Sequence, residues 1–294
     1  MYVLALLAFL VACTPPERAP ASAGVATMSD TGRVRVAGSS LFYEAAGAGS
    51  PVILLHGGNL DRRMWDAEFA ALLHTHRVIR YDARGYGRSG PADTAFAAHD
   101  DLRLLMDALS VPRGSLVGLS LGGRIAIDFA LAYPERVDRL VLVAPGISGG
   151  TWAEDADTAW LRVARKAAKR HDSVAVARAW LGSAYIRTAL RDSATARRVR
   201  GWVEDQAAFW AGIVRHQDLE VEAAPAAAGR LGELEVPILL VVGTADTPLI
   251  QDVARAIEAR AAHVQRLNIP GVGHMVNLEA PRPFLAAVTE FLAR

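Results

Sequence analysis

The chain has 294 residues, of which 52% are hydrophobic, and its formal net charge at neutral pH is +1. This length suits one large α/β domain with an insertion or two small domains, and the hydrophobic fraction is sufficient for a sizeable core. A net charge so close to zero gives no reason to expect nucleic acid or an acidic macromolecule as a partner. The single cysteine cannot form an intramolecular disulfide, so cysteine usage does not identify the cellular compartment.

The N-terminal segment is apolar up to that cysteine. Residues 1–12 carry no charge, and they are fewer than the roughly 20 residues that a membrane-spanning helix needs. Their length is typical of the hydrophobic region of a signal peptide. Leu10-Val11-Ala12-Cys13 resembles the lipobox of bacterial lipoproteins, in which the cysteine is lipidated, although no lysine or arginine precedes Cys13. The alternative is a buried N-terminal helix with a core cysteine.

Residues 14–30 are rich in proline, alanine, serine and threonine and show no hydrophobic period. This composition is typical of a flexible tether. We therefore expect a signal peptide over 1–12, a tether over 13–30 and a lipid anchor at Cys13. These features would place the protein in a bacterial cell envelope as a lipoprotein, whereas a cytoplasmic protein is the alternative.

From Arg33 onward, short apolar runs alternate with helical patterns. The runs predict strands over Val34–Val36, Leu41–Glu44, Val52–Leu55, Val78–Tyr81, Ser115–Leu119, Leu140–Val143, Ile238–Val242 and Val264–Leu267. The clearest helical patterns cover Met64–Leu73, Phe96–Leu109, Leu121–Ala132, Ile250–Ala261 and Pro283–Leu292. Continuous apolar strands are expected where helices cover both faces of a sheet. The alternation therefore predicts an α/β fold with an eight-stranded, mostly parallel sheet.

One region interrupts this alternation. Residues 148–235 are helical in pattern and contain five of the six tryptophans, so we expect a helical cap inserted after the sixth strand of a core formed by 31–147 and 236–294. The tryptophans could dock the cap on the core or line a substrate pocket. The pocket candidates are Trp152, Trp160, Trp180 and Trp210. The arginines of this region could bind a substrate carboxylate, but we favour the interpretation that they lie on solvated helix faces.

A candidate nucleophile follows the fifth predicted strand. Ser120 lies between Gly118 and Gly122 in Gly-Leu-Ser-Leu-Gly-Gly, with a helical pattern immediately after it. Such a serine sits on a sharp strand-to-helix turn, and small neighbours are needed because the backbone is strained there. A serine hydroxyl also needs an adjacent base, which a third group orients.

The base and the acid are expected near the C-terminus. His274 lies in a glycine-rich loop after the last predicted strand, and we interpret it as the base rather than as a structural histidine. Asp246 follows the preceding strand and could orient His274, cap the next helix, or do both. The order Ser120, Asp246, His274 matches that of α/β-hydrolases.

A glycine pair after the third predicted strand is a candidate for the oxyanion hole. In His56-Gly57-Gly58-Asn59, the backbone amide of Gly58 could join that of Leu121 in an oxyanion hole, with Asn59 as the alternative donor. His56 is then expected to be structural. No spacing typical of a metal site is present, and we expect no cofactor.

Together with these motifs, Asp82-Ala83-Arg84-Gly85-Tyr86-Gly87-Arg88-Ser89 resembles a loop of the α/β-hydrolase superfamily, and the resemblance extends from Arg33 onward. Residues 59–66 more weakly resemble 3-oxoadipate enol-lactonase-like members. The resemblance implies a serine hydrolase acting on a small ester or lactone. A carbon–carbon bond hydrolase, a cofactor-free haloperoxidase or perhydrolase, and a non-catalytic surface binding protein remain alternatives. The sequence does not indicate the oligomeric state.

Overall fold

A computed structural model describes residues 30–150, 159–206, 209–210, 212 and 218–294. Within these residues one eight-stranded sheet has the order β1-β2-β4-β3-β5-β6-β7-β8. The strands are β1 (Asp30–Val36), β2 (Ser39–Ala46), β3 (Pro51–Leu55), β4 (Arg77–Tyr81), β5 (Gly114–Leu119), β6 (Val137–Val143), β7 (Ile238–Gly243) and β8 (Val264–Ile269). β2 pairs antiparallel with β1 and with β4, and every other neighbouring pair is parallel.

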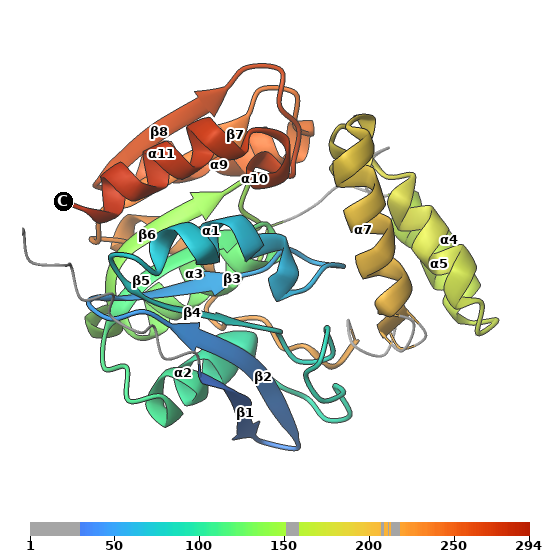
Figure 1. Cartoon of the computed structure of the whole chain (residues 1–294), viewed down its shortest axis with the longest axis horizontal. Coiled ribbons are helices and arrows are strands. Elements are labelled where there is room, and N and C mark those ends of the chain that lie inside the picture. Colours follow the sequence, from blue (N-terminus) through green and yellow to red (C-terminus); the bar gives the residue numbers. More distant parts are fainter. Residues whose placement is uncertain (1–29, 151–158, 207–208, 211, 213–217) are drawn as a thin grey trace, which may run out of the picture.

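Helices cover both faces of this sheet (Figure 1). The helices of the core are α1 (Asp66–Leu72), α2 (Ala98–Ala108), α3 (Leu121–Ala132), α9 (Pro248–Arg260), α10 (Val276–Glu279) and α11 (Pro281–Leu292). α1 contacts α11, and α2 contacts α3. The eight-stranded, mostly parallel sheet with helices on both faces confirms the fold predicted from the sequence.

A second group of helices lies between β6 and β7. It comprises α4 (Ala159–Ala168), α5 (Ser173–Leu181), α6 (Ala184–Arg187) and α7 (Ser193–Asp205). Figure 1 shows α4, α5 and α7 grouped together at one end of the sheet. The insertion of helices after the sixth strand is as predicted.

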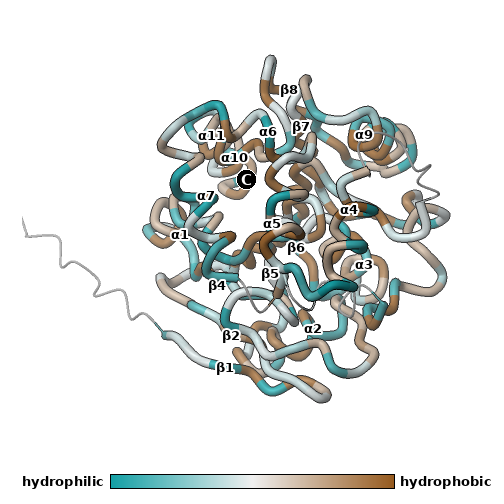
Figure 2. Tube along the Cα trace, turned by 90° about the vertical axis from the view of Figure 1, so that its right-hand side faces the viewer, coloured by the Kyte–Doolittle hydropathy of each residue, from teal (hydrophilic) through white to brown (hydrophobic). Residues whose placement is uncertain are grey.

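The core forms where the sheet is covered on both faces. Every residue of β5 and β7 is buried, as is every residue of β3 except Pro51. In Figure 2 the most hydrophobic segments gather in the middle of the molecule, around β5 and β6. Continuous apolar strands of this kind need cover from both sides, which agrees with the observed layers. The carboxyl ends of the parallel strands consequently meet at one edge and can bring distant residues together.

The predicted helix Leu121–Ala132 coincides with α3, whereas the other four predicted helices start two residues away from the observed ones. The pattern over Met64–Leu73 resolves into a 3₁₀ turn at Arg62–Trp65 followed by α1, because the Asp61 carboxylate accepts a hydrogen bond from the Arg63 amide and starts the turn early. The described residues include no helix that is long and apolar enough to span a membrane. Residues 1–29, which hold the predicted signal peptide, Cys13 and almost all of the predicted tether, lie outside the described residues.

Candidate active site

Ser120 occupies the sharp turn between β5 and α3. Its φ of 53° and ψ of −108° define a backbone conformation that residues other than glycine rarely adopt. A Cβ at Gly118 would lie 2.3 Å from the carbonyl oxygen of Gly122, and a Cβ at Gly122 would lie 2.2 Å from that of Leu55. The strained turn predicted from the sequence is therefore present, and it requires glycine on both sides of the serine.

The backbone of Ser120 is held from three directions. Its amide donates to the carbonyl of Val143 over 3.0 Å, and its carbonyl accepts from the amides of Arg124 and Gly146. These bonds connect the end of β5 to the end of β6 and to the first turn of α3. The backbone of Ser120 is thereby held at the carboxyl edge of the sheet.

His274 and Asp246 come from the loops that follow β8 and β7. His274 Nδ1 lies 2.9 Å from Asp246 Oδ2, and Asp246 Oδ1 accepts a hydrogen bond of 2.7 Å from the Thr247 amide. The two side chains are 2% and 0% exposed. Because an ionised carboxylate can only accept, Nδ1 carries the hydrogen and Nε2 is left as the acceptor. The structure thus pairs two residues that are 28 positions apart in the sequence.

Glu279 holds the loop that carries His274. Its Oε2 accepts from the Gly273 amide over 2.7 Å, and its Oε1 accepts from the Met275 amide over 3.1 Å. Burial raises the pKa of this carboxyl, and the two amides partly offset that increase. The carboxylate bridges the residues on either side of His274 and so fixes its backbone. Sequence reasoning missed Glu279, because nothing in its neighbourhood distinguishes it from a surface glutamate.

His56 connects the loops after β3 and β4. Its Nε2 accepts from the Ala83 amide over 2.9 Å, and its Nδ1 donates to the Gly57 carbonyl over 2.8 Å. Asp82, which begins the second loop, accepts from the Arg62 amide over 2.9 Å. Both ring nitrogens of His56 are engaged by backbone, so its role is structural, as the sequence analysis expected.

The glycine pair after β3 lies next to the start of α3. A Cβ at Gly58 would be 3.8 Å from the Leu121 Cβ, which is an ordinary van der Waals distance, so Gly58 lies beside the residue that follows Ser120. Asn59 has a positive φ of 65°. Burial raises the pKa of the Tyr86 hydroxyl, and a hydrogen bond from the Asn59 backbone amide partly offsets this increase. Gly58 and Asn59 both line the cavity that Ser120 lines, so the backbone amide of either residue is placed near the serine.

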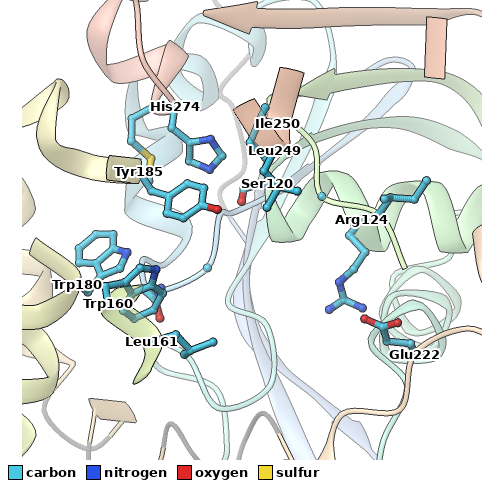
Figure 3. A pocket seen from close by; sticks show the side chains of 15 residues that line it. Ser120, Arg124, Trp160, Leu161, Trp180, Tyr185, Glu222, Leu249, Ile250 and His274 are labelled. Carbon is cyan, nitrogen blue, oxygen red and sulfur yellow. The ribbon is translucent and has the colours of Figure 1, made fainter. Parts of the chain in front are cut away.

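Ser120 and His274 line one cavity of about 320 Å³, which is at the small end of the range for small-molecule sites (Figure 3). Its other lining residues are Gly58, Asn59, Arg124, Gly146, Ile147, Trp160, Leu161, Trp180, Tyr185, Glu222, Leu249, Ile250 and Met275. Most of these side chains are apolar. They come from the carboxyl edge of the sheet and from the inserted helices, so the cavity lies between the two.

The tryptophans proposed for the pocket have different locations. Trp160 and Trp180 line the cavity that Ser120 lines, whereas Trp210 lines a separate cavity with residues of α5 and α7. The Trp210 ring lies 5.8 Å from that of Trp180, and its Nε1 donates to the Val203 carbonyl. Trp210 therefore packs behind Trp180. Trp152 lies outside the described residues.

Tyr185 is a second residue that the sequence analysis missed. It lies on α6, lines the cavity, and packs edge-on against His274 with 4.9 Å between the ring centroids. Nothing in its helical pattern marks it as part of a site. Its contact with His274 shows that the inserted helices reach the candidate base.

The arginines of the inserted helices do not line this cavity. Arg162, Arg165, Arg170, Arg197, Arg198 and Arg200 are all exposed. The arginine that does line it is Arg124, which comes from α3 and forms an ion pair of 2.5 Å with Glu220. The solvated-face interpretation of the cap arginines therefore holds.

This arrangement provides the components of nucleophilic catalysis. A serine on a strained turn shares a cavity with a histidine whose tautomer is fixed by a buried carboxylate, and backbone amides lie beside it. Within the described ranges, no group of three or more histidine, cysteine, aspartate or glutamate side chains is placed to hold a metal ion. The chemistry that the geometry offers is acyl transfer through the serine.

Some known proteins are similar to this chain over about a third of its length, and others over most of it. The first curated relatives are uncharacterised mycobacterial proteins, 37% identical over 107 residues, and the chain matches 31% of their length. A pimeloyl-[acyl-carrier protein] methyl ester esterase of Edwardsiella ictaluri is 30% identical over 86% of this chain and 97% of its own length. A solved structure of an enol-lactonase from Burkholderia xenovorans superposes with a TM-score of 0.73 over 90% of this chain and 100% of its own, at 24% identity.

The family model for the alpha/beta hydrolase fold matches residues 50–281, which include β3, the Ser120 turn, the inserted helices and the loop of His274. This range covers most of the chain. Its fold, in which β2 runs antiparallel to its neighbours β1 and β4 in an otherwise parallel sheet, agrees with the match. The chain belongs to the alpha/beta hydrolase fold family.

Proposed function

We propose that this chain is a serine hydrolase that cleaves a small carboxylic ester or a lactone through an acyl-enzyme intermediate. The observation that carries this proposal is the strained Ser120 in a cavity shared with His274, whose Nδ1 lies 2.9 Å from the buried Asp246 carboxylate. A serine hydrolase needs this combination, whereas a binding protein does not.

The three side chains of the triad have distinct roles in the reaction. Ser120 Oγ attacks the substrate carbonyl carbon while His274 Nε2 takes the hydroxyl proton, and Asp246 stabilises the imidazolium that forms. His274 then gives this proton to the departing alkoxide, which leaves as the alcohol. In the second half, water attacks the acyl-enzyme, its proton passes to His274, and the acid is released as Ser120 recovers its proton.

The developing oxyanion needs backbone donors. We assign this role to the amides of Gly58 and Leu121, because Gly58 lines the cavity next to Ser120 and its backbone lies close to Leu121. Asn59 is the alternative donor, because it lines the same cavity. Each such donor contributes about 3–4 kcal/mol to transition-state stabilisation.

The cavity supports a small substrate with apolar parts. Trp160 and Trp180 supply wide aromatic surface, and Leu249 and Ile250 supply aliphatic surface. The Edwardsiella relative is named as a methyl ester esterase, which favours ester cleavage. The Burkholderia neighbour is titled an enol-lactonase, and at its low identity it supports the fold.

Hydrolysis of p-nitrophenyl butyrate by the purified protein and by its Ser120→Ala variant tests this proposal. We expect turnover by the wild type, none above background in the variant, and full activity in the control Ser193→Ala, which removes an exposed hydroxyl from the inserted helices. A panel of esters, lactones and β-diketones then identifies the bond that is cleaved. Cleavage of β-diketones without esters would instead indicate a carbon–carbon bond hydrolase.

We also propose the organisation outside the site. Residues 31–147 and 236–294 form the core and residues 148–235 form the cap, since the cavity lies between the helices of the cap and the strand ends of the core.

Residues 1–12 act as a signal peptide, residues 13–30 as a tether, and Cys13 carries the lipid that holds the protein in the cell envelope. Metabolic labelling with palmitate tests the anchor: we expect label on the wild type and none on Cys13→Ser.

A further inference from the structure

The cavity has one charged wall. Among its described lining residues, only Arg124 and Glu222 carry full charges at neutral pH. Figure 3 shows these two side chains on the other side of Ser120 from His274 and the two tryptophans, with the carboxylate of Glu222 directed at the guanidinium of Arg124. A substrate held at Ser120 therefore extends toward apolar surface on one side and toward charge on the other.

The positive charge of Arg124 is already compensated. Its Nη2 lies 2.5 Å from Glu220 Oε1, and its Nη1 lies 3.7 Å from Asp128 Oδ2. Burial lowers the pKa of Arg124, but Glu220, Asp128 and Glu222 raise it by more. Two carboxylates, those of Glu220 and Glu222, oppose one guanidinium even if buried Asp128 is counted as protonated. The net charge at this wall is therefore negative.

Glu222 is held in place by backbone. Its Oε2 accepts a hydrogen bond of 2.9 Å from the Gly149 amide, whereas its Oε1 has no hydrogen-bond partner among the described residues. The segment before it is fixed by a bridge, in which Phe96 donates to the Leu219 carbonyl and accepts from the Val221 amide. The fold thus orients the Glu222 carboxylate through Oε2 and leaves Oε1 open to a ligand.

We propose that Glu222 is a specificity-determining residue, which selects esters whose remote end is neutral or positively charged and excludes those that end in a carboxylate. This inference rests on the proposed ester hydrolysis at Ser120. A substrate carboxylate at this wall would be repelled by two like charges, that of the partly buried Glu220 and that of Glu222, which is exposed and lines the cavity. A cationic or hydrogen-donating group would instead meet the open Oε1.

Two matched substrate series test the inference, because the remote group could lie in the acyl or the alcohol half. The acyl series comprises p-nitrophenyl esters of 4-(trimethylammonio)butyrate, its neutral isostere 5,5-dimethylhexanoate, and monoesterified adipate. The alcohol series comprises butyrate esters of choline, 3,3-dimethylbutanol and glycolate. For the wild type we expect kcat/KM to fall from cation to neutral to anion in one of the two series, by about tenfold or more in total.

The variants are Glu222→Gln, which keeps the shape and removes the charge, and Glu235→Gln, which removes the same charge from an exposed residue outside the cavity. We expect Glu222→Gln to reduce the discrimination at least threefold while it still cleaves the neutral esters, and Glu235→Gln to leave the discrimination unchanged. Thermal unfolding of both variants confirms that they are folded.

Three results would overturn the inference: no ordering by charge in either series, an ordering that Glu222→Gln does not alter, or a preference for the anion. A preference for the anion would mean that Arg124 binds substrate carboxylates and that the Glu222 carboxylate lies at the position where they bind. Failure of the proposed function gives a different result, because the neutral esters would then not be cleaved by the wild type, or would be cleaved equally by Ser120→Ala.

Discussion

Replacement of Asp246 by asparagine separates orientation of the base from folding. In the wild type, Asp246 Oδ2 accepts from His274 Nδ1–H, and its Oδ1 accepts from the Thr247 amide. Asparagine can keep the Thr247 bond through its oxygen, but its NH₂ group then faces His274 and donates to Nδ1. The histidine is forced into the other tautomer, in which Nε2 carries the hydrogen and cannot accept the proton of Ser120.

The expected cost follows from that change. Loss of the correct tautomer lowers kcat by about 10⁴-fold in this kind of triad, which corresponds to about 5 kcal/mol of transition-state stabilisation. The stability of the fold should fall by only about 1–3 kcal/mol, the contribution of one buried charged hydrogen bond. Turnover of p-nitrophenyl butyrate and thermal unfolding measure the two effects separately.

Asp252→Asn is the matched control, because this exposed aspartate on α9 pairs only with the equally exposed Arg255 in the described structure. We expect it to retain full activity. A kcat for Asp246→Asn within tenfold of the wild type would refute the reasoning. So would a parallel loss of folding and activity, because the aspartate would then act as a structural residue.

Three further predictions concern the Ser120 turn, a pair of glycines in the core and in α7, and a buried carboxyl group. Ser120→Gly should abolish ester hydrolysis and raise the melting temperature, because glycine relieves the positive φ; an unchanged or lower melting temperature would contradict the claim of strain. Gly118→Ala should destabilise the fold by more than about 2 kcal/mol in urea unfolding, whereas Gly201→Ala, where an added Cβ meets nothing within 4 Å, should stabilise α7 by about 0.5–1 kcal/mol. Burial raises the pKa of Glu68 to about 7, although hydrogen bonds and Arg198 oppose this increase. The folded state therefore favours the protonated carboxyl group. The stability that this group contributes is fully present below the unfolded pKa near 4.5 and is lost as pH rises to 7. Glu68→Gln should therefore exceed the wild type in unfolding free energy by about 3 kcal/mol at pH 8 and match it at pH 4, and a gap that does not depend on pH would contradict this.

Most of the fold could be predicted from local pattern. The central strands are continuous apolar runs such as Val52–Leu55, which are typical of a sheet that helices cover on both faces. The Ser120 turn could also be predicted, because the turn leaves no room for a Cβ at positions 118 and 122 and the sequence has glycine at both. Helix ends were less accurate, since a side-chain cap such as Asp61 shifts a start without changing the hydrophobic period.

The support around the site was less predictable. Glu279 holds the His274 loop by accepting hydrogen bonds from two backbone amides. Nearly every residue has such an amide, so the sequence does not show which ones a side chain binds. Tyr185 and Glu222 reach the cavity because the inserted helices and the segment after them fold back over the sheet, which is a long-range property. Trp210 shows the converse: an aromatic residue in the cap suggested the pocket, but the structure places it behind Trp180.

Labelling with a fluorophosphonate probe tests the central claim most directly, because the probe reacts only with a serine that an adjacent base activates. Intact-mass analysis of the folded protein should show one adduct, and peptide mapping should locate it on Ser120. The Ser120→Ala and His274→Ala variants should not be labelled. An unlabelled folded wild type, or an adduct on any other residue, would contradict the assignment of Ser120 as the nucleophile.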